Sequence, residues 1–147
     1  MSFIHSIQTK AAIWAQRHGV MVARLALGII FIWFGVLKYF PGLSPAEEVV
    51  KNTITFISPE LFIPVLATWE VVIGIGFLLG RSMWLILLLL LLHMPGTFLP
   101  LVVTPDAVWS QFPYGLTLEG QYIIKNFAIL STALFIAASL LPSEKHS

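Results

Sequence analysis

The chain has 147 residues, of which 58% are hydrophobic and only 10% charged, and its mean hydropathy is +0.91. A soluble domain carries about 25% charged residues, so this composition excludes an ordinary soluble fold and predicts an integral membrane protein. Without cysteine, the chain cannot form disulfides, cysteine-ligated zinc sites or iron–sulfur clusters, and it cannot perform thiol catalysis. A net charge of +1 gives no basis for nucleic-acid binding. At about 20 residues per crossing, the length leaves room for four helical spans.

The polar and apolar side chains of residues 1–19 separate onto two faces of a predicted helix. We expect this helix to lie in the membrane interface, with its tryptophan at the level of the lipid headgroups. A frayed tail is the alternative interpretation. The apolar face consists of Phe3, Ile7, Ala11 and Trp14, and the residues that lie away from it are Gln8, Lys10, Gln16 and Arg17.

Residues 20–39 form the first predicted span, with Arg24 and Lys38 near its two ends. Long basic side chains at such positions can extend toward water. After a Pro-Gly turn, the segment 44–47 (SPAE) reads as a capping box with proline at the first helical position. It predicts a second short interfacial helix, which ends at Ser58-Pro59.

The second predicted span covers residues 61–80 and is interrupted only by Glu70. The third covers residues 83–103 and contains His93 near its middle. Two prolines and a glycine follow within residues 95–100, so the second half of this span is expected to be kinked or broken.

A loop is expected at residues 104–119, followed by the fourth span at 120–141, which carries Lys125 and Asn126. Short connections make sequential helices antiparallel neighbours. The predicted fold class is therefore an all-α membrane protein: a single domain, 1–147, built as an antiparallel four-helix transmembrane bundle with two interfacial helices.

The distribution of lysine and arginine predicts the orientation of the chain. Four spans place both termini and the turn between spans two and three on one side of the membrane. Positive residues favour the cytoplasmic side, so the modest excess on this side predicts that both termini are cytoplasmic. The basic residues on this side are Lys10, Arg17, Arg24, Arg81 and Lys145, and those toward the other side are Lys38, Lys51 and Lys125.

The ionisable residues within the spans are candidates for function, because a charge at the bilayer centre costs about 2.5–3.5 kcal/mol. Helical spacing places Glu70, His93 and Lys125 in one cluster between the midplane and the outer side. This cluster can be a Glu70–Lys125 pair that fixes helix register, a pocket for a ligand head group, or a proton relay. The spacing leaves open whether Glu70 faces Lys125 or Lys38, and it places Arg24 deeper on the cytoplasmic side.

Several chemistries are excluded by the absence of their residues. A membrane b-type haem usually has two axial histidines within the spans, and only His93 lies in one. The sequence contains no zinc-hydrolase spacing and no glycine-rich phosphate loop. We therefore expect no intrinsic cofactor, no metal and no redox centre that belongs to the chain itself.

Three ordered stretches carry a family resemblance: 24–28 (RLALG) leading to 34–39 (FGVLKY), then 93–100 (HMPGTFLP), and finally 116–126 (LTLEGQYIIKN). Together they resemble the DoxX-like family of small four-helix membrane proteins, over residues 20–141. The resemblance implies several possible settings: quinone-linked sulfur oxidation, thiol or oxidative-stress systems, and membrane chaperones. It implies no agreed catalytic residues. The candidate ligand-binding residues are Arg24, Lys38, His93, Gln121, Lys125 and Asn126, with Glu70 added on physical grounds.

From these observations we expect a redox-linked subunit of a bacterial-type inner membrane. Its polar pocket would bind a quinone or a similar polar-headed lipophilic ligand, and a partner would supply the electrons. An accessory subunit is favoured over a self-sufficient enzyme, surrounded by lipid and in contact with a protein partner or with further copies of itself. The alternatives are a non-enzymatic assembly factor or chaperone, and a carrier of protons or small molecules.

Overall fold

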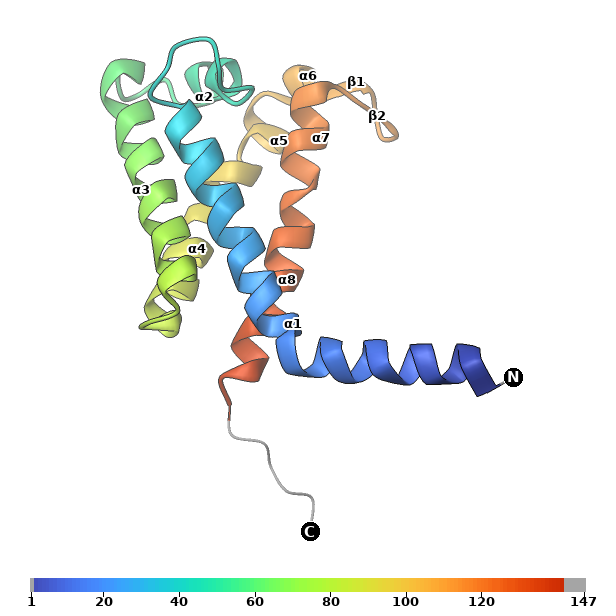
Figure 1. The fold of residues 1–147 in the computed structure, drawn as a ribbon. Helices are drawn as coiled ribbons and strands as arrows, with labels where there is room; N and C mark the ends of the chain where they lie inside the picture. Colours follow the sequence, from blue (N-terminus) through green and yellow to red (C-terminus); the bar gives the residue numbers. More distant parts are fainter. Residues whose placement is uncertain (1, 142–147) are drawn as a thin grey trace.

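The computed structural model describes residues 2–141 and consists of four long apolar helices with short elements at one end (Figure 1). All four helices are long and apolar enough to cross a membrane. The predicted all-α membrane fold with four spans is therefore confirmed. The predicted polar tail, including Lys145, lies outside the described residues, as does the side chain of Phe3.

Helix α1, Ser2–Leu37, joins two elements that the sequence predicts as separate. It contains no proline, so nothing ends the helix between the predicted interfacial segment and the first span. Side chains from Ile4 to Arg17 are exposed. Figure 1 shows this N-terminal part leaving the bundle and running across its axis, whereas the rest of α1 stands beside α3. We call residues 2–19 the N-terminal arm.

Helix α2, Glu47–Thr53, is the predicted short helix between the first two spans, but the predicted capping box is wrong. The N-cap residue is Ala46, and no side chain caps the helix. The Glu47 carboxylate instead accepts hydrogen bonds from the Gly42 N–H and from Lys51 Nζ, each at 2.7 Å. Glu47 therefore ties the preceding turn to α2, which lies over one end of the bundle (Figure 1).

Helix α3, Pro59–Leu79, ends at Gly80, whose φ of 68° suits a residue without a side chain. Helix α4, Met83–Phe98, continues through Pro95, and the break comes at Pro100, where α5, Pro100–Val103, begins. The predicted interruption of the third span is therefore present, five residues beyond the first of its prolines. Proline suits the first turn of a new helix, where its missing N–H costs nothing.

The segment predicted as a loop contains regular structure. Helix α6, Pro105–Val108, leads into an antiparallel ribbon of β1, Trp109–Gln111, and β2, Gly115–Leu116. Helix α7, Leu118–Ile124, follows, and α8, Asn126–Ser139, completes the fourth span. The separation of α7 from α8 at Lys125 was not predicted, because neither proline nor glycine stands at this point.

Three glycines allow α1 and α3 to pack with their backbones close together. A Cβ atom at Gly74 would lie 2.7 Å from the backbone nitrogen of Ile32 and 2.8 Å from the carbonyl oxygen of Gly28. A Cβ atom at Gly35 would lie 3.1 Å from the Ala67 carbonyl oxygen. Small residues allow such approaches in membranes, where van der Waals packing holds helices together. At these glycines the two helix backbones therefore leave no room for a side chain.

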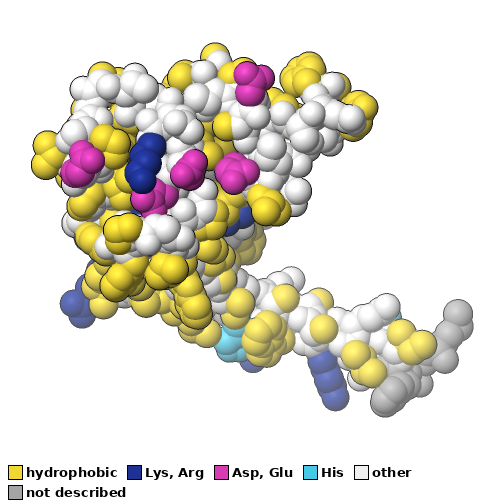
Figure 2. All heavy atoms as spheres, turned by 90° about the horizontal axis from the view of Figure 1, so that it is seen from above, with side chains coloured by type: hydrophobic (Ala, Val, Ile, Leu, Met, Phe, Trp, Pro, Cys, Tyr) yellow, Lys and Arg dark blue, Asp and Glu magenta, His cyan; other side chains and the backbone are white. Residues whose placement is uncertain are grey.

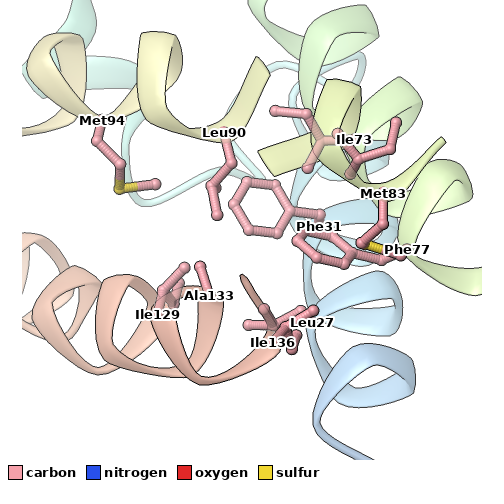
Figure 3. Packing of buried hydrophobic residues seen from close by; sticks show 11 residues of the cluster. Leu27, Phe31, Ile73, Phe77, Met83, Leu90, Met94, Ile129, Ala133 and Ile136 are labelled. Atoms are coloured by element: carbon pink, nitrogen blue, oxygen red, sulfur yellow. The ribbon is translucent and has the colours of Figure 1, made fainter. Parts of the chain in front are cut away.

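The main core lies between α1, α3, α4 and α8, where apolar side chains from all four helices meet (Figure 3). Phe77, Ile73 and Leu90 are at most 1% exposed. A smaller cluster of Val49, Val108 and Ile123 lies beneath the α2 end. The cluster shown in Figure 3 consists of Leu27, Phe31, Ile73, Phe77, Met83, Ile86, Leu90, Met94, Ile129, Ala133 and Ile136.

Candidate functional site

Glu70 lies between two basic groups in the interior of the bundle. Lys38 Nζ donates a hydrogen bond of 2.6 Å to Glu70 Oε2, and His93 Nε2 lies 3.3 Å from Glu70 Oε1. The side chains of Lys38, Glu70 and His93 are 4%, 9% and 5% exposed, respectively. The structure thus answers the question that the spacing left open: Glu70 pairs with Lys38, and the alternative Glu70–Lys125 pair is not formed.

The three groups of this cluster come from three helices. Lys38 follows the end of α1, Glu70 lies in the middle of α3, and His93 lies in α4. The close approach at Gly35 brings the end of α1 against Glu70, whose Cβ atom would lie 3.1 Å from a side chain at that glycine. The His93 ring stands edge-on to Phe31, with centroids 5.9 Å apart. Helix packing therefore fixes the position of each ionisable group.

A cavity of about 120 Å³ extends from this cluster toward α2. At roughly 10–15 Å³ for each probe-sized water site, it has room for several water molecules or for a small head group. Most of its lining is aliphatic or aromatic, and a few polar groups converge on it, as is typical of small-molecule sites. Its polar and charged lining residues are Lys38, Thr53, Glu70, His93, Thr97, Glu119, Tyr122, Lys125 and Asn126.

Lys125 lines the same cavity from the junction of α7 and α8. Its Nζ atom lies 3.4 Å from the centroid of the Tyr122 ring and 4.3 Å from that of Phe34. These two rings stand edge to face, 5.4 Å apart. Among the described residues, no carboxylate lies within 4 Å of Nζ. Aromatic faces stabilise a desolvated ammonium group by about 2 kcal/mol, and they leave its charge uncompensated.

Asn126 is adjacent to Lys125 and also lines the cavity. It is 7% exposed, and its side-chain amide makes no hydrogen bond within residues 2–141. Buried polar groups are nearly always hydrogen-bonded in folded proteins, so an amide without a partner at a cavity wall is open to a ligand or to water.

Two of the predicted site residues lie elsewhere. Gln121 is exposed and does not line the cavity. Arg24 lies at the opposite end of α3, where its guanidinium would collide with any side chain at Gly80, and its buried Nε atom has no hydrogen-bond partner among the described residues. Lys38, Glu70, His93, Lys125 and Asn126 share one cavity.

Sequence reasoning missed the aromatic pair that holds Lys125. Phe34 stands four residues before Lys38, so it lies on the same face of α1. Tyr122 is three residues before Lys125 and so shares its face of α7. Aromatic residues at these spacings are ordinary in membrane helices, and only the fold shows that both rings meet one ammonium group.

The groups on this cavity can donate hydrogen bonds and can hold or release protons. Lys38 keeps the Glu70 carboxylate paired, and His93 has a second ring nitrogen beyond the one near Glu70. Among residues 2–141, no three His, Asp or Glu side chains are placed to hold a metal ion. The arrangement is a mostly apolar cavity with ionisable side chains along its wall.

Comparison with known proteins gives one match. A family model described as DoxX matches residues 19–104. The match contains Lys38, Glu70 and His93 and ends before the junction of α7 and α8. No curated protein and no solved structure matches the chain.

Proposed function

Since this chain belongs to the DoxX family, we propose that it is a membrane subunit that binds a quinone or a similar polar-headed lipophilic molecule. A partner protein supplies the electrons. The observation that carries this proposal is the Lys38–Glu70–His93 cluster, buried at the wall of an otherwise apolar cavity that lies among the spanning helices.

The lining of the cavity supports both parts of such a ligand. Phe31, Phe34, Phe62 and neighbouring aliphatic side chains offer apolar contacts to a ring and to the start of a tail. His93 and the Asn126 amide line the cavity and would donate hydrogen bonds to the carbonyl oxygens of the ligand. A pocket of this composition selects ligands by a few polar contacts within an apolar surround.

The chain itself contributes proton exchange and no electrons. A bound quinone would supply two-electron chemistry that takes up two protons. The residues of this chain that can hold or pass a proton at the cavity are His93 and Glu70, and Lys38 positions the Glu70 carboxylate. The chain has no cysteine. This composition supports an accessory role beside a partner that carries the redox centre.

Co-purification and direct binding test the proposal together. The protein is reconstituted in nanodiscs, and its bound small molecules are extracted from one sample and identified by mass spectrometry. A second sample is titrated with a short-tailed benzoquinone by calorimetry. We expect a bound quinone, and about tenfold weaker binding for Glu70→Gln and for His93→Phe, because each variant removes a polar contact worth about 1–1.5 kcal/mol. His18→Phe is the matched control, because His18 lies on the N-terminal arm and does not line the cavity.

The opposite results would redirect the assignment. A wild-type protein that carries no quinone and binds none would end the proposal. Recovery of a stoichiometric protein partner with an empty cavity would favour an assembly factor or chaperone. If Glu70→Gln does not fold, a Lys38→Met/Glu70→Gln variant keeps the test open, since it removes both charges of the pair at once.

We also propose that the chain lies in a bacterial-type inner membrane with both termini in the cytoplasm. Acidic side chains gather at the α2 end (Figure 2). The exposed lysine of α2 is Lys51. The opposite end carries arginine and lysine, a pattern that supports a cytoplasmic location. A C-terminal reporter that is active only outside the cytoplasm would contradict this orientation. The acidic residues at the α2 end are Glu47, Glu48, Glu60, Asp106 and Glu119, and the basic residues at the other end are Lys10, Arg17, Arg24 and Arg81.

A further inference from the structure

A groove between α1 and α8 adjoins the cavity described above. It is open on one side, encloses about 410 Å³, and its described lining carries no charged side chain. Ile30 and Ile129 line both the groove and the cavity, so the two spaces meet at these side chains. From this junction the groove runs to Gly19 and to Trp14 of the N-terminal arm. The groove therefore extends the cavity away from α2, along the length of the bundle.

One continuous face of α1 lines both spaces and changes from polar to apolar along its length. Lys38 and Phe34 line the cavity, Ile30 lies at the junction, and Ala26 and Ala23 line the groove. These positions are three or four residues apart, so they follow one another on one side of the helix. A molecule that lies along this face would meet ionisable groups at one end and only hydrocarbon at the other.

Helix α8 presents the same change of polarity. Asn126 lines the cavity, Ile129 lies at the junction, and Thr132 lines the groove, again at a spacing of three residues. The Thr132 hydroxyl donates to the Ala128 carbonyl of its own helix at 2.8 Å. Asn126 is 7% exposed, and its side-chain amide makes no hydrogen bond within residues 2–141. A buried amide without a partner marks the cavity as the place of a polar head group.

A lipophilic ligand in the cavity needs a path for its apolar part. The cavity, at about 120 Å³, has room for a head group but not for a long tail. Toward α2 it leads to the end of the bundle where acidic side chains gather (Figure 2), and hydrocarbon is disfavoured beside charge and water. Toward Ile30 and Ile129 it leads into the apolar groove. The groove is therefore the favourable path for the tail.

We propose that the groove between α1 and α8 binds the apolar tail of a ligand whose head group occupies the cavity. The inference rests on the proposed function, because it concerns the same ligand, and it adds a tail site and the direction of the tail toward the N-terminal arm. Gly19 and Ile30 are 11 positions apart, which corresponds to about 16 Å of helix. An extended chain advances by less than one bond of about 1.5 Å per carbon, so the groove accommodates a tail of about ten carbons.

Two probes with the same head group test the tail site. The first is 2,3-dimethoxy-5-methyl-1,4-benzoquinone, which has no tail, and the second is its 6-decyl derivative. Each is titrated by calorimetry into the protein in zwitterionic nanodiscs of one composition. Partition of a given probe into the lipid is then the same for every variant, so differences between variants report the protein site.

Variants that fill the groove should discriminate between the probes. Ala26→Phe and Ala128→Phe are suitable, because both alanines are exposed and line the groove but not the cavity. We expect each variant to bind the decyl probe at least about tenfold more weakly than the wild type, since overpacking a filled site is unfavourable to about this degree. The tail-less probe should change by less than about twofold. Ala138→Phe is the matched control, because Ala138 is exposed on α8 and lines neither space.

Photolabelling of the wild type locates the tail without any substitution. The decyl probe carries a diazirine at the end of its tail, and the labelled residues are identified by mass spectrometry. We expect labels between Gly19 and Ala26 on α1 or at Thr132 on α8. A tenfold excess of the tail-less probe should suppress them, because it competes for the head-group cavity.

The outcomes separate this inference from the proposed function. If neither probe binds the wild type, the proposed function fails. If both bind and the groove variants weaken neither, the quinone cavity stands and the tail site is wrong. Labels confined to α2, α3 or α4 also overturn the tail site. Labels in the groove that the tail-less probe does not suppress would identify ordinary membrane lipid as the occupant and overturn it too.

Discussion

A double-mutant cycle on Lys38 and Glu70 measures whether their ion pair stabilises the bundle. The Nζ–Oε2 distance is 2.6 Å, and both side chains are at least 91% buried. Removing one partner of a buried pair leaves an uncompensated charge and typically costs about 3–5 kcal/mol, whereas replacing both is often close to neutral. We expect Lys38→Met and Glu70→Gln each to destabilise by about 3 kcal/mol, and the double variant by about 1 kcal/mol or less.

The chain offers a matched control pair at nearly the same distance. Lys51 Nζ lies 2.7 Å from Glu47 Oε1, but Lys51 is 44% exposed, so solvent screens the interaction. Unfolding by dodecyl sulfate in mixed micelles, followed by circular dichroism, gives the free energy of unfolding for each variant. The cycle on Lys38 and Glu70 should show strong coupling and the control cycle none above error. Additive effects in the buried pair would refute the reasoning.

Three further predictions concern packing, capping and pH. Gly74→Val should destabilise the fold by about 2 kcal/mol or more, because its Cβ would meet the α1 backbone. Gly19→Ala should leave the stability unchanged, because there is open space around Gly19. The unfolding assay described above measures both effects. Thr117→Val should cost about 1 kcal/mol and Thr117→Ser much less, since the Thr117 hydroxyl caps α7 by accepting from a backbone N–H at 3.0 Å. Hydrogen bonds from Lys51 and then from the Gly42 N–H lower the pKa of Glu47. The stability that Glu47 gives the turn is therefore present above the ordinary glutamate pKa and is lost as the pH falls through the lowered value. Over that range the protection of the Gly42 amide from hydrogen exchange, corrected for intrinsic rate, should fall, and unchanged protection would contradict the assignment.

The long apolar helices could be predicted because each is a continuous hydrophobic run with recognisable ends. Composition and span length are enough to give four crossings in 147 residues. Pro100 signals the break in the third span, since it removes a backbone donor. The junction at Lys125 carries no such signal, because it is a single residue with right-handed helical angles between α7 and α8.

The membership of the polar cluster was predicted better than its pairing. Helical spacing gives the depth of a residue but not the direction from which a neighbouring helix approaches. Lys38 reaches Glu70 because Gly35 lets α1 lie against α3. The two residues are 32 positions apart in the sequence. Lys125 faces Phe34 and Tyr122 instead. Gln121 belongs to the same sequence stretch as Asn126 but is exposed, whereas Asn126 is buried. Spacing alone did not distinguish these two residues.

The two lysines at the cavity therefore have different physical roles, and the difference can be measured. Lys38 has a carboxylate at 2.6 Å, so its removal should lower stability first and ligand binding second. Lys125 has only ring faces as partners, so its removal relieves an uncompensated charge and should leave stability almost unchanged or improved. The same substitution should nevertheless change the binding of a ligand in the cavity, because Lys125 lines it. If Lys125→Met instead destabilised the bundle as much as Lys38→Met, both lysines would be structural.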